Sequence, residues 1–148
     1  SYLGVSGTTS VARSGMFFAG SRTHILDATD GASNTLLVGE RPPSVDMVYG
    51  WWYAGTGQFL TGQLDSHLGV TERNIFGTAY RGCPSDGYAF RPRARTDPCA
   101  AFQFWSHHPG GAHFLLTDAS IRFLTHAAAP TMPALATRSG GEVASVPD

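Results

Sequence analysis

The chain has 148 residues, an ordinary length for one globular domain, and we expect residues 1–148 to form a single domain. Its formal net charge is −1, and its basic residues are scattered arginines without a single lysine. This pattern argues against nucleic acid or an anionic lipid surface as a partner. The apolar runs are too short to cross a membrane and Ser1 does not open an export signal, so we expect either a cytosolic protein or one lacking its targeting end.

Glycine and proline interrupt the chain nearly everywhere, and no long segment has apolar residues at helical spacing. The sequence therefore predicts a mainly β protein, α+β at most, with an antiparallel sheet and long irregular loops. The first strands are expected where aromatic or β-branched runs are bounded by glycine or proline. These runs are "GMFFAG" at 15–20, "TLLVGE" at 35–40 and "MVYGWWYAG" at 47–55.

The segment "DATDGASN", before the second expected strand, can either form a turn or bind a cation. Asp30-Gly31 suits a tight turn, and Asn34 can accept hydrogen bonds from nearby backbone amides. The alternative is a structural calcium ion held by Asp27, Asp30 and Asn34, since calcium takes oxygen ligands. Because the EF-hand spacing is absent, we prefer the turn and expect no cofactor.

Trp51, Trp52 and Tyr53 form an aromatic cluster in the third expected strand. Our preferred interpretation is a core strand with alternate rings buried. The functional alternative is a binding groove in which these rings, with Trp105, stack on a glycan or a peptide.

Residues 56–97 are rich in Gly, Asp, Asn and Arg and predict long loops, which indicates an insertion, an interaction surface or a loop held by a disulfide. Cys83 and Cys99 bracket the arginine-rich end of this region. No further Cys or His stands near them at zinc spacing, so we expect a disulfide, which favours an exported protein. Two free buried thiols are the alternative in a reducing cytosol.

The stretch "FWSHHPGGAHFLLTDASIRFL", residues 104–124, predicts a β-hairpin with strands at 112–117 and 120–125. A two-residue turn at Asp118-Ala119 would join them, and because such a turn prefers glycine second, Ala119 carries a steric cost. This register gives a buried face and an opposite face. The buried face is Phe114 paired with Phe123 and Leu116 paired with Ile121, and the opposite face is His113, Leu115, Arg122 and Leu124.

The histidines of this stretch raise the question of a metal or catalytic site. His108 and Asp118 lie one strand length apart, roughly 20 Å, so they cannot share an ion. We expect His108 to bond its own loop or Glu40, and Asp118 to accept backbone amides of its turn. His113 could join another histidine in a ligand set, but a structural role is preferred, and we predict no metal site.

Catalytic residues are not predicted, because neither Ser106 nor Ser120 lies in a strand-turn-helix nucleophile elbow. Further along, Thr131 and Pro133 suit the start of a short C-terminal helix over 134–138, which Gly140-Gly141 would end.

Three ordered blocks, "DGASNTLLVGER", "FWSHHPGGAHFLLTDASIRFL" and "MPALATRSGGE", resemble the C-terminal part of the bacterial prepilin-type processing-associated family of unknown function. That family is named for a histidine followed by nine residues and Asp-Gly. Its signature falls on His108 and Asp118, with Ala119 in place of the glycine. The resemblance marks as structural residues His108, Gly110, Gly111, Asp118, Asp30, Gly31, Asn34 and Glu40.

The resemblance implies a pilin-like globular region without its N-terminal helix, in an exported, non-enzymatic subunit at the cell surface, in the periplasm or outside the cell. Its expected partners are copies of itself or other pilin-like subunits, with membrane attachment only through that helix. The alternatives are the aromatic binding module and, less favoured, a metal-dependent enzyme.

Overall fold

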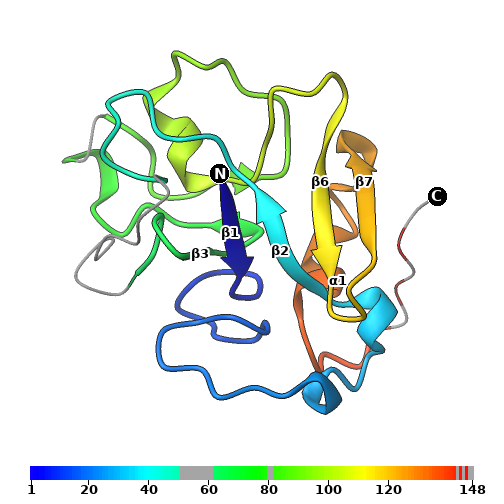
Figure 1. The fold of residues 1–148 in the computed structure, drawn as a ribbon. Helices are drawn as coiled ribbons and strands as arrows, with labels where there is room; N and C mark the ends of the chain where they lie inside the picture. Colours follow the sequence, from blue (N-terminus) through cyan, green and yellow to red (C-terminus); the bar gives the residue numbers. More distant parts are fainter. Residues whose placement is uncertain (51–61, 80–81, 143, 145, 147–148) are drawn as a thin grey trace.

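The computed structural model describes residues 1–50, 62–79, 82–142, 144 and 146 (Figure 1). Its main element is a five-stranded sheet with the order β3-β1-β2-β6-β7. β3 runs parallel to β1, and the other neighbouring strands are antiparallel. The predicted mainly β fold is confirmed, although the sheet is mixed at one edge. The strands are β1 (Tyr2–Val5), β2 (Leu36–Glu40), β3 (His67–Leu68), β6 (Gly111–Leu116) and β7 (Ile121–Thr125).

The remaining regular structure is short. Strands β4 (Thr71–Glu72) and β5 (Tyr88–Ala89) form a separate pair. The single α-helix of the described residues, α1 (Met132–Ala136), has Pro133 in its first turn as predicted, and none of the described helices is long and apolar enough to span a membrane. The 3₁₀ turns are η1 (Ile25–Asp27), η2 (Ala32–Asn34), η4 (Gly77–Ala79), η5 (Pro98–Phe102) and η6 (His126–Ala128).

The hydrophobic core lies against one face of the large sheet. Strand residues such as Leu3, Leu36 and Phe114 belong to the same buried cluster as Met132 and Leu135 of α1. The helix therefore packs on the core side of the sheet. Further members come from the long segment between β2 and β6, among them Leu64, Val70, Tyr88, Phe90 and Phe102.

The strand predictions have mixed outcomes. The strand expected at 35–40 is confirmed as β2, but residues 15–20 form a loop. There the amides of Gly15 and Phe17 bond the carbonyls of Ser6 and Val5, and the chain then turns away at Phe18. Residues 47–50 of the third expected strand are bends instead, with a positive φ at Met47, and residues 51–55 lie outside the described part.

The hairpin of β6 and β7 forms, but its predicted register is wrong by one residue. Leu116 bonds Ser120 across a three-residue turn, not a two-residue one, and β6 pairs Leu115 with Ile121 and His113 with Phe123. Cross-strand partners share a face of a sheet. Leu124 therefore points into the core, whereas Ile121 and Phe123 are 67% and 40% exposed on the opposite face.

Candidate functional site

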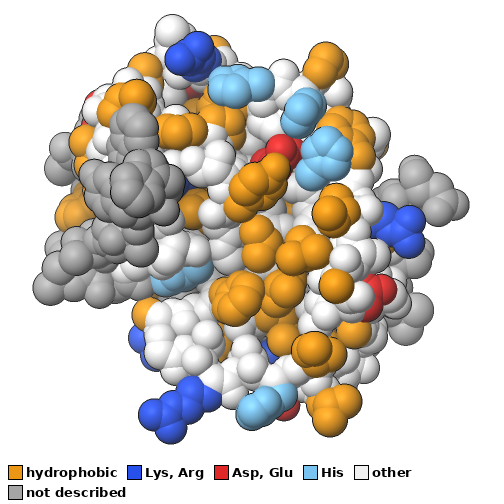
Figure 2. Space-filling model, viewed as in Figure 1, with side chains coloured by type: hydrophobic (Ala, Val, Ile, Leu, Met, Phe, Trp, Pro, Cys, Tyr) orange, Lys and Arg blue, Asp and Glu red, His pale blue; other side chains and the backbone are white. Residues whose placement is uncertain are grey.

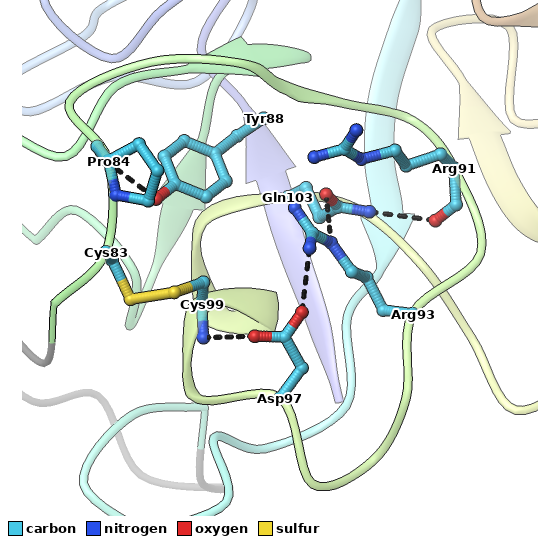
Figure 3. Close-up of polar contacts among 8 residues, drawn as sticks. All are labelled: Cys83, Pro84, Tyr88, Arg91, Arg93, Asp97, Cys99 and Gln103. Carbon is cyan, nitrogen blue, oxygen red and sulfur yellow. Dashed lines mark hydrogen bonds and ion pairs between the residues drawn. A yellow bond between two sulfur atoms is a disulfide. The ribbon is translucent and has the colours of Figure 1, made fainter.

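Cys83 and Cys99 form a disulfide, as predicted, across a sequence separation of 16 residues (Figure 3). Inside the loop that it closes, the Tyr88 hydroxyl donates to the Pro84 carbonyl at 2.8 Å. Asp97 accepts the Cys99 amide at 2.8 Å and so caps η5. The disulfide thus anchors a loop with internal hydrogen bonds of its own.

Arg93 connects the middle of this loop to its C-terminal end and to the segment that follows. Its guanidinium donates to Gln103 at 2.8 Å and pairs with Asp97 at 2.7 Å, and the Gln103 amide donates to the Arg91 carbonyl at 2.8 Å (Figure 3). These polar groups hold the loop in one shape. Arg93, Asp97 and Gln103 therefore have a structural role in this loop.

On the face of the sheet opposite the core, two rows of residues cross four strands. Glycine, valine, leucine and isoleucine form one row, and the other row contains a carboxylate and an imidazole between two aromatic rings. By strand register the first row is Gly4, Val38, Leu115 and Ile121, and the second is Tyr2, Glu40, His113 and Phe123. We call this surface the outer face.

A β-bulge in β2 brings Glu40 to the outer face. Leu36 pairs with the buried Leu116, but two residues later Val38 pairs with Leu115, one step along β6. The extra residue reverses the alternation of the strand, so Leu36 faces the core while Val38 faces outward. Glu40, two residues after Val38, is outward as well and lies beside His113.

Glu40, His108 and His113 form a compact cluster at the end of the outer face. The Glu40 carboxylate lies 3.4 Å from Nε2 of His108 and 3.3 Å from Nδ1 of His113, and it accepts the backbone amide of His113 at 2.7 Å. The two imidazole rings are perpendicular, with centroids 5.1 Å apart. The predicted contact between His108 and Glu40 is therefore present. His113, for which the sequence predicted a structural role of its own, belongs to the same cluster.

The loop before β6 holds His108 in place. The Ser106 hydroxyl accepts the His108 amide at 2.9 Å and donates to the Gly111 carbonyl at 2.7 Å, which closes the loop on itself. Gly110 has a positive φ of 84°. A Cβ on Gly111 would lie 2.1 Å from the Leu124 carbonyl oxygen, so the close approach of β7 requires glycine there.

The cluster borders an open pocket of about 480 Å³ on the outer face. Apart from Glu40, His108 and His113, its lining is Tyr2, Val38, Phe114, Leu115 and Ile121. A second pocket, of about 300 Å³, shares Tyr2 and Val38 and continues past Phe17 and Phe18 to His67. Figure 2 shows hydrophobic side chains gathered over this part of the sheet, with an acidic group and histidines at one end.

Asp118 lies at the far end of the hairpin from this cluster, as predicted. Its carboxylate accepts the hydroxyl of Ser120 at 2.7 Å and the amide of Ser120 at 2.9 Å, and these bonds lower the pKa of Asp118. The Asp118 amide donates to the Ala32 carbonyl of η2 at 3.1 Å. Asp118 thus shapes the turn and docks it on the "DGASN" segment.

The two aspartates proposed as calcium ligands, Asp27 and Asp30, have another role in the structure. The Asp30 carboxylate accepts the amides of Gly140 and Gly141, at 2.6 Å and 3.1 Å, and Asp27 accepts the His24 amide at 2.8 Å. The predicted turn at Asp30-Gly31 is present: Gly31 has a φ of +101° and its amide donates to the Ala28 carbonyl at 3.0 Å. The carboxylates of Asp27 and Asp30 thus accept hydrogen bonds from the backbone of the chain itself.

Of the four aromatic residues of the proposed groove, Trp105 lies in the described part of the chain. Trp51, Trp52 and Tyr53 lie outside the described residues. Trp105 is 3% exposed and its ring lies edge-on to His107, so it has no free face on which a sugar could stack. Trp105 therefore does not belong to a surface groove.

Residues 3–131 match the family described as a protein of unknown function, DUF1559. The chain belongs to this family. It is a pilin- and pseudopilin-associated family without an assigned function, in agreement with the resemblance of the sequence blocks. Neither the curated proteins nor the solved structures contain a significant match to this DUF1559 chain.

Proposed function

We propose that this DUF1559 protein is an exported, non-enzymatic subunit of a pilin-like assembly at the cell surface or in the envelope, and that it contacts neighbouring subunits through its outer face. The observation that carries this proposal is the apolar surface over β1, β2, β6 and β7 (Figure 2). Tyr2 and Ile121 are each 67% exposed there. Large apolar patches of this kind on a protein surface mark sites of interaction.

Two further observations support export and assembly. The Cys83–Cys99 disulfide is a bond that persists in oxidising compartments outside the cytosol. Family membership agrees, because DUF1559 is associated with pilins and pseudopilins.

The experiment compares cells that naturally make the protein with cells carrying Ile121→Arg or Leu26→Arg. Ile121 lies on the outer face, whereas Leu26, 90% exposed in η1, is an apolar surface residue outside both pockets and serves as the control. We expect cell fractionation to find the wild-type protein outside the cytoplasm, with Cys83 and Cys99 resistant to thiol labelling. Chemical crosslinking should give high-mass species for the wild type and Leu26→Arg, and few for Ile121→Arg.

Two results would overturn the proposal. One is recovery of the wild-type protein in the cytoplasm with reactive thiols. The other is the same crosslinking pattern in Ile121→Arg as in Leu26→Arg, because a charge on the outer face must disturb an interface that buries it.

A further inference from the structure

We propose that Glu40, His108 and His113 bind one divalent transition-metal ion of the Zn²⁺ type. Each side chain offers one ligand atom, and these three atoms all lie within 4.8 Å of one another. Among the described residues they are the group of histidines, cysteines and carboxylates with this spacing. The inference concerns a binding site and is independent of the proposed role in assembly.

The distances agree with a coordination shell. Nitrogen and oxygen ligands bind Zn²⁺ at about 2.0–2.1 Å, so two ligand atoms at a tetrahedral angle lie about 3.3 Å apart. Oε1 of Glu40 lies 3.4 Å from Nε2 of His108, and Oε2 of Glu40 lies 3.3 Å from Nδ1 of His113, so each imidazole nitrogen is at ligand spacing from one of the two carboxylate oxygens. Binding then requires a small closing of the three side chains around one ion, and His108 stands in an exposed loop beside Pro109 and Gly110, which can shift.

The ligand types select the kind of ion. Two imidazoles and one carboxylate suit Zn²⁺ and related transition metals, whereas Ca²⁺ and Mg²⁺ prefer a shell of oxygens. Thiols do not compete for the ion, because Cys83 and Cys99 are joined in the disulfide.

The cluster has one fixed and two accessible members. The Glu40 side chain is 11% exposed, held at the end of β2 by the amide of His113, while the side chains of His108 and His113 are 53% and 42% exposed. Phe123 packs edge-on to the His113 ring, with centroids 5.0 Å apart. An ion can therefore enter from solvent, and the apolar pocket lies beside the cluster.

The same contacts could also be hydrogen bonds that serve the fold alone, and titration of the purified protein with ZnCl₂ separates the two cases. The protein carries no histidine tag, is first treated with a chelator, and is then followed by calorimetry. We expect one Zn²⁺ per chain for the wild type. Because losing even a group that only orients a ligand weakens metal affinity by about 10- to 100-fold, His108→Ala should weaken it at least that much.

His107→Ala is the matched control, because His107 is the exposed neighbour of His108 in the same loop but lies outside the cluster. It should bind Zn²⁺ as the wild type does. A second measurement follows melting temperature, which a metal that binds only the folded state must raise. Zn²⁺ should raise it in the wild type and in His107→Ala, and much less in His108→Ala, whose folding in the absence of metal the same scan verifies.

The proposal fails if the wild type binds no Zn²⁺, or if His108→Ala binds it as tightly as His107→Ala. It also fails if Mg²⁺ or Ca²⁺ binds in place of Zn²⁺ with higher affinity, since that would require an oxygen shell.

Discussion

Ala119 has a backbone φ of +69° in the turn between β6 and β7, a conformation that strains an L side chain. Glycine removes that strain but also gives the unfolded chain more freedom, so the two effects partly cancel. We expect Ala119→Gly to raise the free energy of unfolding by up to about 1 kcal/mol, measured by urea denaturation. Ala134→Gly, inside α1, is the control and should lower it by about 0.5–1 kcal/mol. A loss of stability in Ala119→Gly would contradict this account of the turn.

Asp118 should titrate below its ordinary pKa of 3.8, because the hydroxyl and then the amide of Ser120 bond its charged form. A carboxyl whose pKa is lower in the folded state stabilises the fold above pH 3.8, and this contribution is lost as the pH falls through the folded-state pKa. We expect NMR titration to give a lower pKa for Asp118 in the wild type than in Ser120→Ala. Equal pKa values in both proteins would show that the Ser120 hydroxyl is not the cause.

Single polar residues were the most predictable part of the candidate site. The contact of His108 with Glu40 and the hydrogen bonds within the Asp118 turn follow from side-chain chemistry and position in the chain. The place of His113 in the cluster does not follow in this way. It depends on which face of the sheet Glu40 occupies, and that is decided by the bulge in β2.

At the scale of elements, the prediction of the hairpin register failed because of an irregular turn. The hairpin pattern assumed a two-residue turn, and the third turn residue moved the register so that Ile121 and Phe123 face outward. Alternation along a strand cannot reveal such a shift, because one residue exchanges the two faces. The apolar outer face was therefore invisible in the sequence.

The strand at the N-terminus shows a different limit. β1 has only four residues, and its Gly4 has no side chain to mark a face, so the pattern was weak. "GMFFAG" at 15–20 has the stronger local signal, yet it remains a loop against the end of β1. Tertiary contacts here outweigh β propensity, which mainly reflects how a side chain packs.

The disulfide loop is an element whose contribution can be measured. Closing a loop of this length restricts the unfolded chain by roughly 3 kcal/mol. We expect Cys83→Ala/Cys99→Ala to unfold with a free energy lower by about that amount, since the hydrogen bonds of Arg93 and Asp97 can still form. Reductant should destabilise the wild type to the same level and leave the double variant unchanged. Equal stability of wild type and variant without reductant would contradict this role.

For the whole molecule, the three sequence blocks meet in space. The Thr117 amide donates to the Thr35 carbonyl at 2.9 Å and the Asp118 amide to Ala32, which joins the hairpin to the "DGASNTLLVGER" block. At the opposite end Glu40 contacts His108 and His113. The Asp30 carboxylate holds Gly140 and Gly141 of the third block. The residues of the resemblance thus connect the sheet to its flanking segments.

The stability of the whole fold should depend on pH through one buried and one half-buried histidine. His67 in β3 is 5% exposed, and its burial, with the charge of Arg13 added, lowers its pKa from the ordinary 6.5. Burial also lowers the pKa of His126. A histidine with a lower pKa in the folded state takes up its proton first in the unfolded chain, so stability is complete above pH 6.5 and declines as the pH falls through the folded-state pKa.

We therefore expect the free energy of unfolding to fall on acidification below pH 6.5, and to fall less steeply in His67→Gln, which has no imidazole to protonate. Comparing variants across pH cancels the contributions of other groups, including Glu72, whose pKa is raised by burial. His24→Gln is the control, because it makes the same substitution at an exposed histidine. Urea denaturation at a series of pH values gives these slopes, and a slope in His67→Gln equal to that of the wild type would show that His67 is not among the groups that make the fold sensitive to acid.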